Sequence, residues 1–475
     1  MTATPSASGG RSLPFPRLLA FSTGSTPVYI MAILVGVYLP KFYAGHIGLT
    51  LLALGGVMAT VRLTDLGFDL ALGWLMDKTH TRFGRYRPWY AAGLPIFAIA
   101  AYQLFNPPAG AGTSYLFIWL IVVYIGYSML ALAHSAWASR IAGAYHERSR
   151  LFGWMQCMAV LGTSSILALP LVTGGRINPA VSTTMGAVGW VVIGVALVVV
   201  PLTLFAAHEP VTAEIKKERT TVQDYLAVIT TPSMYRLIIA ELCLVLGPGV
   251  TGPIYLFFFH DAKGFAFTVV NLLLIPYMSA GLLGAPVWAR VAVKLGKGRT
   301  VQLACVCYAI TQTALMAIPA KLFWPTFAGM FAVGFCASAF LFLLQAMVAD
   351  VGDEVRLKTG KERQGILYAF VTMTQKLGSS MTVSVIFPIL AAVGYNAKET
   401  AVNTPAAIHG LEMCYLFAPI ILVAAGGLLL IGYKLTPQRH AQIRADLAAL
   451  EAASLAGAEV SLTGEPAEES PIAAE

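Results

Sequence analysis

The sequence predicts an all-α, multi-pass membrane protein with twelve transmembrane helices arranged in two six-helix bundles. Three observations lead to this prediction: the large hydrophobic share, the scarcity of charge and the regular recurrence of long apolar runs. Of the 475 residues, 57% are hydrophobic and only 11% are charged, and the mean hydropathy is +0.72. Because a soluble domain carries about 25% charged residues, this composition excludes an ordinary soluble fold.

Apolar runs of about 20 residues, the length of a helix that crosses a bilayer, recur twelve times along the chain. We expect spans at 17–40, 50–76, 88–105, 113–138, 150–175, 182–207, 236–260, 266–293, 300–318, 322–349, 363–394 and 409–434. The six cysteines all fall within these runs, without metal-ligand spacing, so we interpret them as packing residues.

Basic residues are distributed unevenly between the loops, and this predicts the orientation of the chain. Loops after odd-numbered spans hold at most one lysine or arginine each, whereas loops after even-numbered spans, together with the span residues that border them, hold at least three. Because basic loops remain in the cytoplasm, we expect a protein of the cell membrane with both termini in the cytoplasm. The net charge of +8 then reflects topology, and we expect no nucleic-acid partner.

A long polar loop divides the chain into two halves. We expect an N-terminal bundle at 1–207, a cytoplasmic linker at 208–235, a C-terminal bundle at 236–435 and a cytoplasmic tail at 436–475. The tail is largely disordered by composition, with a short amphipathic helix within Gln438–Ala456. Short, basic, glycine-containing loops follow spans 2 and 8, at corresponding places in the two halves. Paired six-span halves are typical of a rocking secondary transporter.

Two carboxylates inside the second span are the most informative residues. Asp65 and Asp69 are four residues apart, so they share one helix face at roughly 6 Å, and Arg62 precedes them on the same stripe. A carboxylate at membrane depth is costly and usually has a function. The pair predicts an oxygen-lined site for a coupling ion, Na⁺ or H⁺. The alternative is an ion-paired stripe that only fixes helix packing.

Lys376 lies near the middle of the eleventh span, with Thr372 and Ser380 on the same helix face. A buried ammonium needs an anionic partner, and we expect Asp65 or Asp69 to supply it across the interface between the halves. The alternative is a lysine that snorkels to one membrane surface.

The fourth span adds polar groups near mid-depth. The hydroxyls of Tyr127 and Ser128 are placed to complete a cation shell or to bind substrate, although core packing explains Tyr127 equally well. We interpret His134 as a hydrogen-bonded residue near the helix end. Glu241, in the seventh span, falls near the expected membrane boundary and is a weaker candidate.

Charged residues also gather at the cytoplasmic ends of spans in both halves. They predict gate ion pairs that close one face in one state and separate in the other, the alternative being ordinary solvated loops. The predicted gating residues are Asp77, Arg85, Arg148, Asp350, Asp353 and Arg363.

Three groups of residues carry a family resemblance. They are Arg62–Asp69 with Gly73–Trp74 and Gly84–Trp89; Glu147–Leu151; and Ala349–Glu354 with Lys358–Gly360, Gly365, Tyr368 and Lys376–Gly378. In order and spacing the chain resembles the glycoside–pentoside–hexuronide:cation symporters, the melibiose-carrier branch of the major facilitator superfamily. The resemblance implies the major facilitator fold and import of a solute with a cation by alternating access.

The resemblance also implies roles for single residues. Asp65 and Asp69 would bind the coupling ion, with Ser128 as a hydroxyl ligand. If that ion is Na⁺, the two aspartates are metal ligands. Lys376 would bridge the cation and substrate sites, and Arg62 would tune the two carboxylates.

The substrate site departs from the pattern of the sugar carriers. Those carriers commonly have acids on the first and fourth spans and a basic residue on the fifth, where this chain has Tyr29, Ala131 and Gln156. We expect a glycoside, a sugar or a sugar acid as substrate, with an amphiphilic, lysolipid-like solute as the alternative. The expected substrate-site residues are Tyr29, Arg62, Tyr127, Ala131, Gln156, Thr372 and Lys376.

Other functional classes fit the residues less well. An enzyme would need a nucleophile–base pair or metal ligands within the spans, and a channel would need pore-lining rings or filter loops; the sequence shows neither pattern. A non-transporting sensor stays open as an alternative. We expect a monomer that needs no cofactor and whose partners are a small molecule and the bilayer.

Overall fold

The computed structural model describes residues 14–79, 81–141, 145–207, 231–359, 364–399, 401–433, 435 and 438–449, without the side chains of residues 77, 145, 146, 148, 149, 358, 359, 364 and 365. Throughout these ranges the regular elements are helices, and the one β-contact is an isolated bridge between Thr81 and Gly84. The expected linker falls mostly outside these ranges, as does the end of the tail. The all-helical fold class is confirmed.

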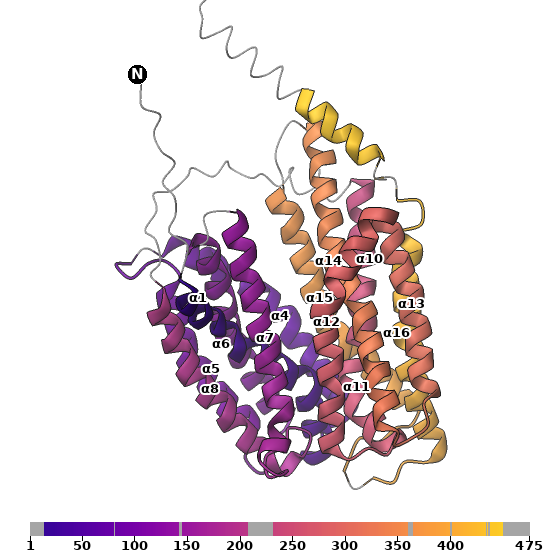
Figure 1. Ribbon diagram of the computed structural model, residues 1–475. Helices are drawn as coiled ribbons and strands as arrows, with labels where there is room; N and C mark the ends of the chain where they lie inside the picture. Colours follow the sequence, from indigo (N-terminus) through magenta and orange to yellow (C-terminus); the bar gives the residue numbers. More distant parts are fainter. Residues whose placement is uncertain are drawn as a thin grey trace, which may run out of the picture.

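The helices form two bundles that stand side by side (Figure 1). The N-terminal bundle contains α1 (Phe15–Ser22), α2 (Thr26–Ile33), α3 (Leu39–Lys41), α4 (Leu51–Lys78), α5 (Arg87–Phe105), α6 (Thr113–Ile141), α7 (Tyr145–Val172) and α8 (Met185–Ala206). The C-terminal bundle contains α10 (Pro232–Gly249), α11 (Thr251–Phe257), α12 (Phe267–Leu295), α13 (Lys297–Ala317), α14 (Phe323–Thr359), α15 (Gln364–Ala392) and α16 (Pro405–Leu429).

Ten helical segments of the described chain are long and apolar enough to cross a bilayer. They correspond to ten of the twelve expected spans, and the other two correspond to α5 and α15. Both of these helices lie inside the bundles, since α5 packs against α6 and α8, and α15 packs against α4 and α10. Polar residues such as Lys376 lower the hydropathy of α15. Twelve membrane crossings therefore stay a prediction at these two helices.

Local sequence signals explain where several helices begin and end. The hydroxyl of Thr50 accepts a hydrogen bond from the Ala53 amide at 3.3 Å and caps α4, and Thr404 caps α16 in the same way. Gly296 has a φ of 83°, a conformation that glycine adopts without steric cost. It lets α12 turn directly into α13.

The first span of each half is an interrupted helix. In the N-terminal half, α2 runs into π-helical segments at Leu34–Tyr38 and Phe42–His46. In the C-terminal half, α11 runs into a π-helical segment at Phe258–Ala262. Such segments occur often at functional sites, and here each one lies at the end of the bundle where the two halves meet.

The interface between the halves is formed by α4 against α15 and by α7 against α12. Gly55 on α4 lies against α15, where a Cβ would make an ordinary van der Waals contact with Phe387 at 3.7 Å. Beside it, the hydroxyl of Ser384 donates a hydrogen bond to the Gly55 carbonyl at 3.1 Å. This packing fixes α15, and with it Lys376, against the helix that carries the two buried carboxylates.

Residues 438–449, within the expected tail, form a further helix. This helix, drawn in yellow, lies at the upper end of the C-terminal bundle in Figure 1. Ile443 is 1% exposed and Leu447 is also buried, so this helix packs against the protein by its apolar face.

Candidate functional site

The two carboxylates of α4 meet groups from two other helices. Asp65 is 6% exposed, and the hydroxyl of Ser128 on α6 donates a hydrogen bond to its Oδ1 at 3.3 Å. Asp69 forms an ion pair with the Nζ of Lys376 on α15. Lys376 thus reaches one of its two expected partners across the interface between the halves. The remaining oxygen of Asp69, Oδ1, is buried and has no hydrogen-bond partner among the described residues.

Arg62 lies beside this group. Its guanidinium carbon stands 4.2 Å from the ring centroid of Tyr124, a cation–π contact. Both Arg62 and Lys376 interact electrostatically with Asp65. Two basic side chains therefore lie beside two acidic ones in this cluster.

A cavity of about 310 Å³ lies between α2, α6 and α7, and its lining residue Tyr127 precedes Ser128 on α6. It is lined by Ser25, Val28, Tyr29, Tyr127, Ala131, His134, Ser135, Phe152, Met155 and Gln156. Four expected substrate-site residues meet there, on α2, α6 and α7. The Tyr29 hydroxyl donates a hydrogen bond to the Gln156 side chain at 3.4 Å.

A second cavity, of about 250 Å³, continues from the first toward the C-terminal half. The two cavities share Tyr29 and Gln156, and the second one reaches Tyr277 on α12 and Ser338 on α14. The lining of both includes hydroxyl, amide and apolar groups but no Asp, Glu, Lys or Arg. A ligand in these cavities would meet neutral hydrogen-bonding partners and aromatic rings.

Two further candidates have local hydrogen bonds that occupy their polar atoms. The hydroxyl of Thr372 donates to the Tyr368 carbonyl one turn earlier at 2.9 Å, and Thr372 lines neither cavity. The Nε2 of His134 lies 3.0 Å from the Phe21 carbonyl oxygen, in agreement with the interpretation of His134 as a hydrogen-bonded residue.

Polar contacts between the halves cluster at the end that carries the loops after odd-numbered spans. The Tyr38 hydroxyl donates to Oδ1 of Asn271 at 2.9 Å, and the Asn271 amide donates to Oδ1 of Asn178 at 2.6 Å. The ammonium of Lys41 stands 3.3 Å from the ring centroid of Phe267. Each of these contacts joins the N-terminal half to the C-terminal half.

Glu399 provides the densest set of contacts at this end. Its carboxylate accepts a hydrogen bond from the Ser182 hydroxyl and lies 3.5 Å from Nδ1 of His46. Its backbone amide donates to the Gly45 carbonyl at 3.3 Å. All three partners belong to the N-terminal half. Sequence reasoning missed Glu399 because it is a single acid in a loop, whereas the predicted gating residues were recognised by their clustering at span ends in both halves.

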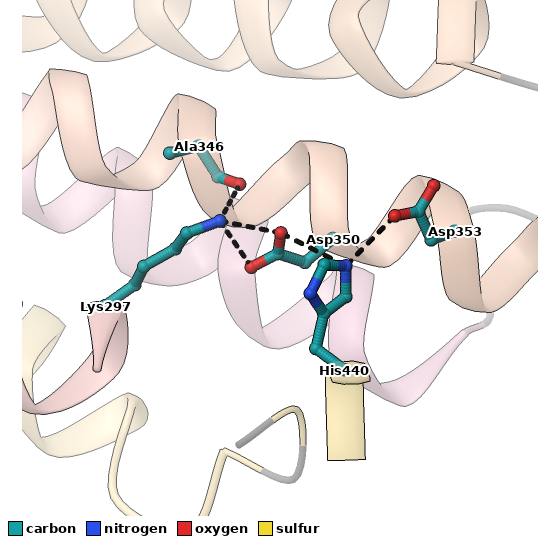
Figure 2. A network of polar contacts seen from close by, with 5 residues as sticks. All are labelled: Lys297, Ala346, Asp350, Asp353 and His440. Carbon is teal, nitrogen blue, oxygen red and sulfur yellow. Dashed lines mark hydrogen bonds and ion pairs between the residues drawn. The ribbon is translucent and has the colours of Figure 1, made fainter. Parts of the chain in front are cut away.

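The predicted gating acids at the opposite end have partners within their own half. Nζ of Lys297 lies 2.6 and 2.7 Å from the two carboxylate oxygens of Asp350. Nε2 of His440, on the tail helix, lies 3.5 Å from Asp350 and 2.9 Å from Asp353 (Figure 2). In this conformation Asp350 therefore joins α14 to α13 and to the tail helix, and Asp353 joins α14 to the tail helix.

The other predicted gating residues are described only in part. The side chains of Asp77 and Arg148 lie outside the described residues, as does Arg363. Arg85 lies half-buried in the loop that follows α4.

Tyr433 lies near the predicted gating acids. Burial and the carboxylates of Asp350 and Glu354 raise the pKa of Tyr433, so its hydroxyl stays protonated.

The chain is similar to known proteins over most of its length. The MFS/sugar transport protein family profile matches residues 20–437. An isoprimeverose transporter of Lactiplantibacillus pentosus is 26% identical over 465 residues, which cover 90% of this chain and 93% of that protein. The putative glycoside/cation symporter YagG of Escherichia coli K12 is 24% identical, with coverages of 84% and 88%.

Solved structures show the same fold at low identity. The nucleoside transporter NupG superposes with a TM-score of 0.64 at 13% identity, covering 88% of this chain and 98% of its own. A bacterial homologue of the human lysosomal transporter Spinster, in an inward-facing and unoccupied conformation, gives a TM-score of 0.63 at 12% identity, with coverages of 93% and 98%.

The family match extends over most of the chain, and the similar proteins are membrane carriers with sugar and glycoside symporters among them. The protein therefore belongs to the MFS/sugar transport family, in its glycoside–pentoside–hexuronide:cation symporter branch, and is a multi-pass membrane transporter rather than an enzyme.

Proposed function

We propose that the protein couples the entry of Na⁺ or H⁺ to the import of a neutral sugar or glycoside by alternating access. The observation that carries this proposal is the ion pair between Asp69 of one half and Lys376 of the other, next to Asp65 and Ser128. The ammonium occupies the place that a coupling ion would take.

The charge balance of the cluster supports coupling. Asp65 and Asp69 are already balanced by Arg62 and Lys376, so an added ion must loosen Lys376 from Asp69. The buried, unpartnered Oδ1 of Asp69 offers an oxygen to that ion. Ion binding would then weaken the contact between the halves and free the ammonium to donate a hydrogen bond to a substrate hydroxyl. The ion thereby changes the relative stability of the two states.

The two adjoining cavities support a neutral substrate. The cavity lining has no Asp, Glu, Lys or Arg, and the ammonium that we propose to reach the substrate, Lys376, is still offset by Asp65. A sugar acid would therefore lack the uncompensated cationic partner that a buried carboxylate requires. Hydroxyl and amide groups of Tyr29, Tyr127 and Gln156 suit sugar hydroxyls, and aromatic rings suit the apolar face of a sugar ring. An amphiphilic, lysolipid-like solute is the second candidate substrate, since it would use fewer of these hydrogen-bonding groups.

The contacts between the halves support an inward-facing arrangement. They lie at the end of the loops after odd-numbered spans, which is extracellular if both termini are cytoplasmic, as the distribution of basic residues predicts. Reorganisation of Glu399, Asn271 and Lys41 would open that end.

Uptake measurements in proteoliposomes test the ion site. We expect Asp65→Asn and Asp69→Asn each to lower accumulation driven by a Na⁺ or pH gradient at least tenfold, because each removes a negative charge from the ion site. Radiolabelled xylosides and glucosides serve as probes. Asp446→Asn, on the exposed face of the tail helix, is the matched control and should transport as the unmodified protein does. Gradient-driven accumulation at full rate in both α4 variants would disprove the ion site.

A binding screen tests the substrate class. Thermal unfolding of the purified protein is measured with neutral glycosides, uronates and lysolipids, each with and without Na⁺. We expect neutral glycosides to raise the unfolding temperature and Gln156→Ala to remove that increase. An increase with uronates or lysolipids alone would replace the proposed substrate class.

A further inference from the structure

A second buried carboxyl lies in the C-terminal half, away from the ion cluster. Glu241 on α10 is 0% exposed. The helix begins at Pro232, earlier than the sequence predicts, which places Glu241 about 13 Å along the helix axis. The carboxyl is therefore deeper than the boundary position expected from the sequence.

The surroundings of Glu241 provide a single neutral partner. The side-chain amide of Gln375 on α15 donates a hydrogen bond to Oε1 of Glu241 at 2.8 Å. The other oxygen, Oε2, is buried and has no hydrogen-bond partner among the described residues. Lys376, the residue after Gln375, pairs with Asp69 instead.

The helices packed around α10 bring no counter-charge to this carboxyl. On α14, Asp350 is held by Lys297, and on α16 the pair of His409 and Glu412 lies near the start of the helix. The titratable residue of α11, Tyr255, donates its hydroxyl to the Val270 carbonyl. In the part of the chain that the structure describes, no cation is paired with Glu241.

An ionised carboxylate in such a place is strongly disfavoured. Removing an unpaired charge from water is costly, and one hydrogen bond from a neutral amide offsets only part of this cost. A protonated carboxyl fits better, because a carboxylic acid and a primary amide can form two hydrogen bonds. The Gln375 amide donates to Oε1 of Glu241, and a proton on the carboxyl would turn the unpartnered Oε2 into a donor that could bond to the Gln375 side-chain oxygen.

We propose that Glu241 is a proton-binding site, separate from the α4 ion site, that holds its proton in this conformation and thereby fixes α15 through Gln375. The proposal rests on the proposed function and adds a second ligand, a proton, to it. Release of that proton requires water to reach Glu241, and therefore requires α15 to move away from α10. Because Gln375 and Lys376 are neighbours on α15, the proton on Glu241 and the ion pair with Asp69 both act on the position of that helix.

Infrared spectroscopy of the full-length protein in lipid bilayers tests the proton directly. At neutral pH we expect a carbonyl stretching band of a protonated carboxylic acid that Glu241→Gln removes. The control variant Glu412→Gln, near the start of α16, should keep the band. A spectrum that Glu241→Gln leaves unchanged would overturn the proposal, whereas the uptake results for Asp65→Asn and Asp69→Asn would be unaffected.

A double-mutant cycle tests the link to α15. Gln375→Leu removes the partner of the carboxyl and should lower the unfolding temperature, while the double variant Glu241→Leu with Gln375→Leu should restore it, because an apolar pair of similar volume replaces the polar one. Independent, additive effects of the two substitutions would show that the pair does not fix α15, and would also overturn the proposal.

Discussion

Asp69 is the residue on which the contact between the halves and the proposed ion site both depend. Its carboxylate is 10% exposed, whereas the side chain of Lys376 is 33% exposed. Breaking the pair therefore costs free energy mainly at the carboxylate, because the freed ammonium can reach water while the carboxylate cannot.

The first prediction at this scale concerns the pair itself. We expect Lys376→Ala to lower the unfolding free energy by about 1–3 kcal/mol, less than the 3–5 kcal/mol of a fully buried pair, because Lys376 is partly exposed. Asp69→Asn in the same chain should recover most of this loss, since it removes the unpaired charge. Thermal unfolding of the two single variants and the double variant measures the coupling. Strictly additive effects would contradict the pair.

Single residues differ in how far the sequence predicts them. Asp65, Asp69 and Lys376 can be found from the sequence because charges are rare in apolar spans. Tyr29, Ala131 and Gln156 carry no such signal, and only alignment with a family singles them out. Glu399 could not be predicted, because polar residues are ordinary in loops and its partners are set by the three-dimensional arrangement of the halves.

At the scale of helices, close packing depends on small residues at a few contacts. A Cβ at Gly126 on α6 would lie 2.7 Å from the backbone nitrogen of Phe97 on α5. Backbone cannot move aside as a side chain can. The contact therefore sets the distance between α5 and α6.

We expect Gly126→Ala to destabilise the protein by about 1–3 kcal/mol, the usual effect of overpacking. Gly194→Ala on α8 is the control, because a Cβ there meets nothing within 4 Å, and it should leave stability unchanged or slightly raised. Thermal unfolding in the same detergent compares the two. Equal effects of the two variants would contradict the close approach of α5 and α6.

Glu399 gives a prediction about the end at which the halves meet. Glu399→Gln weakens the contacts to Ser182 and His46. A cysteine placed at Thr183, in the adjacent cavity, reports the opening of this end by its reaction with an impermeant maleimide. If the closed arrangement loses about 1 kcal/mol of stability, we expect that reaction to be about fivefold faster. Glu412→Gln, whose partner His409 is on the same helix, is the control. Equal labelling rates in the two variants would show that Glu399 does not hold this end closed.

The sequence predicts most helices because apolar length is a strong signal, but it misses their internal breaks. The spans around α4, α6, α12 and α14 agree with the apolar runs. The π-helical segments at Leu34–Tyr38 and Phe258–Ala262 have no comparable signature, since they depend on how one helix packs against its neighbours.

At the scale of the whole molecule, the tail helix adds a contact that composition did not reveal. His440 connects it to Asp350 and Asp353, and Asp350 in turn binds Lys297. The contact lies wholly within the C-terminal half and its tail. The tail helix should therefore move with that half when the two halves rearrange.

Limited proteolysis measures how firmly this helix is held. Arg444 is an exposed residue of the tail helix and a site for trypsin. We expect His440→Ala to increase the rate of cleavage after Arg444 about fivefold, because the tail helix loses about 1 kcal/mol of the free energy that holds it against the bundle. His409→Ala is the control, because the side chain of His409 is 68% exposed and its ion-pair partner Glu412 lies on the same helix, α16. Equal cleavage rates would show that His440 does not anchor the helix.

The bond between Asp69 and Lys376 also has a thermodynamic consequence for measurement. If an ion loosens the ammonium and the ammonium then helps to hold a sugar, each ligand must increase the affinity of the other by the same factor. Titrating sugar at two ion concentrations and titrating ion at two sugar concentrations should give equal ratios of dissociation constants. This reciprocity can be checked by calorimetry alone, without a gradient, a vesicle or a substituted residue.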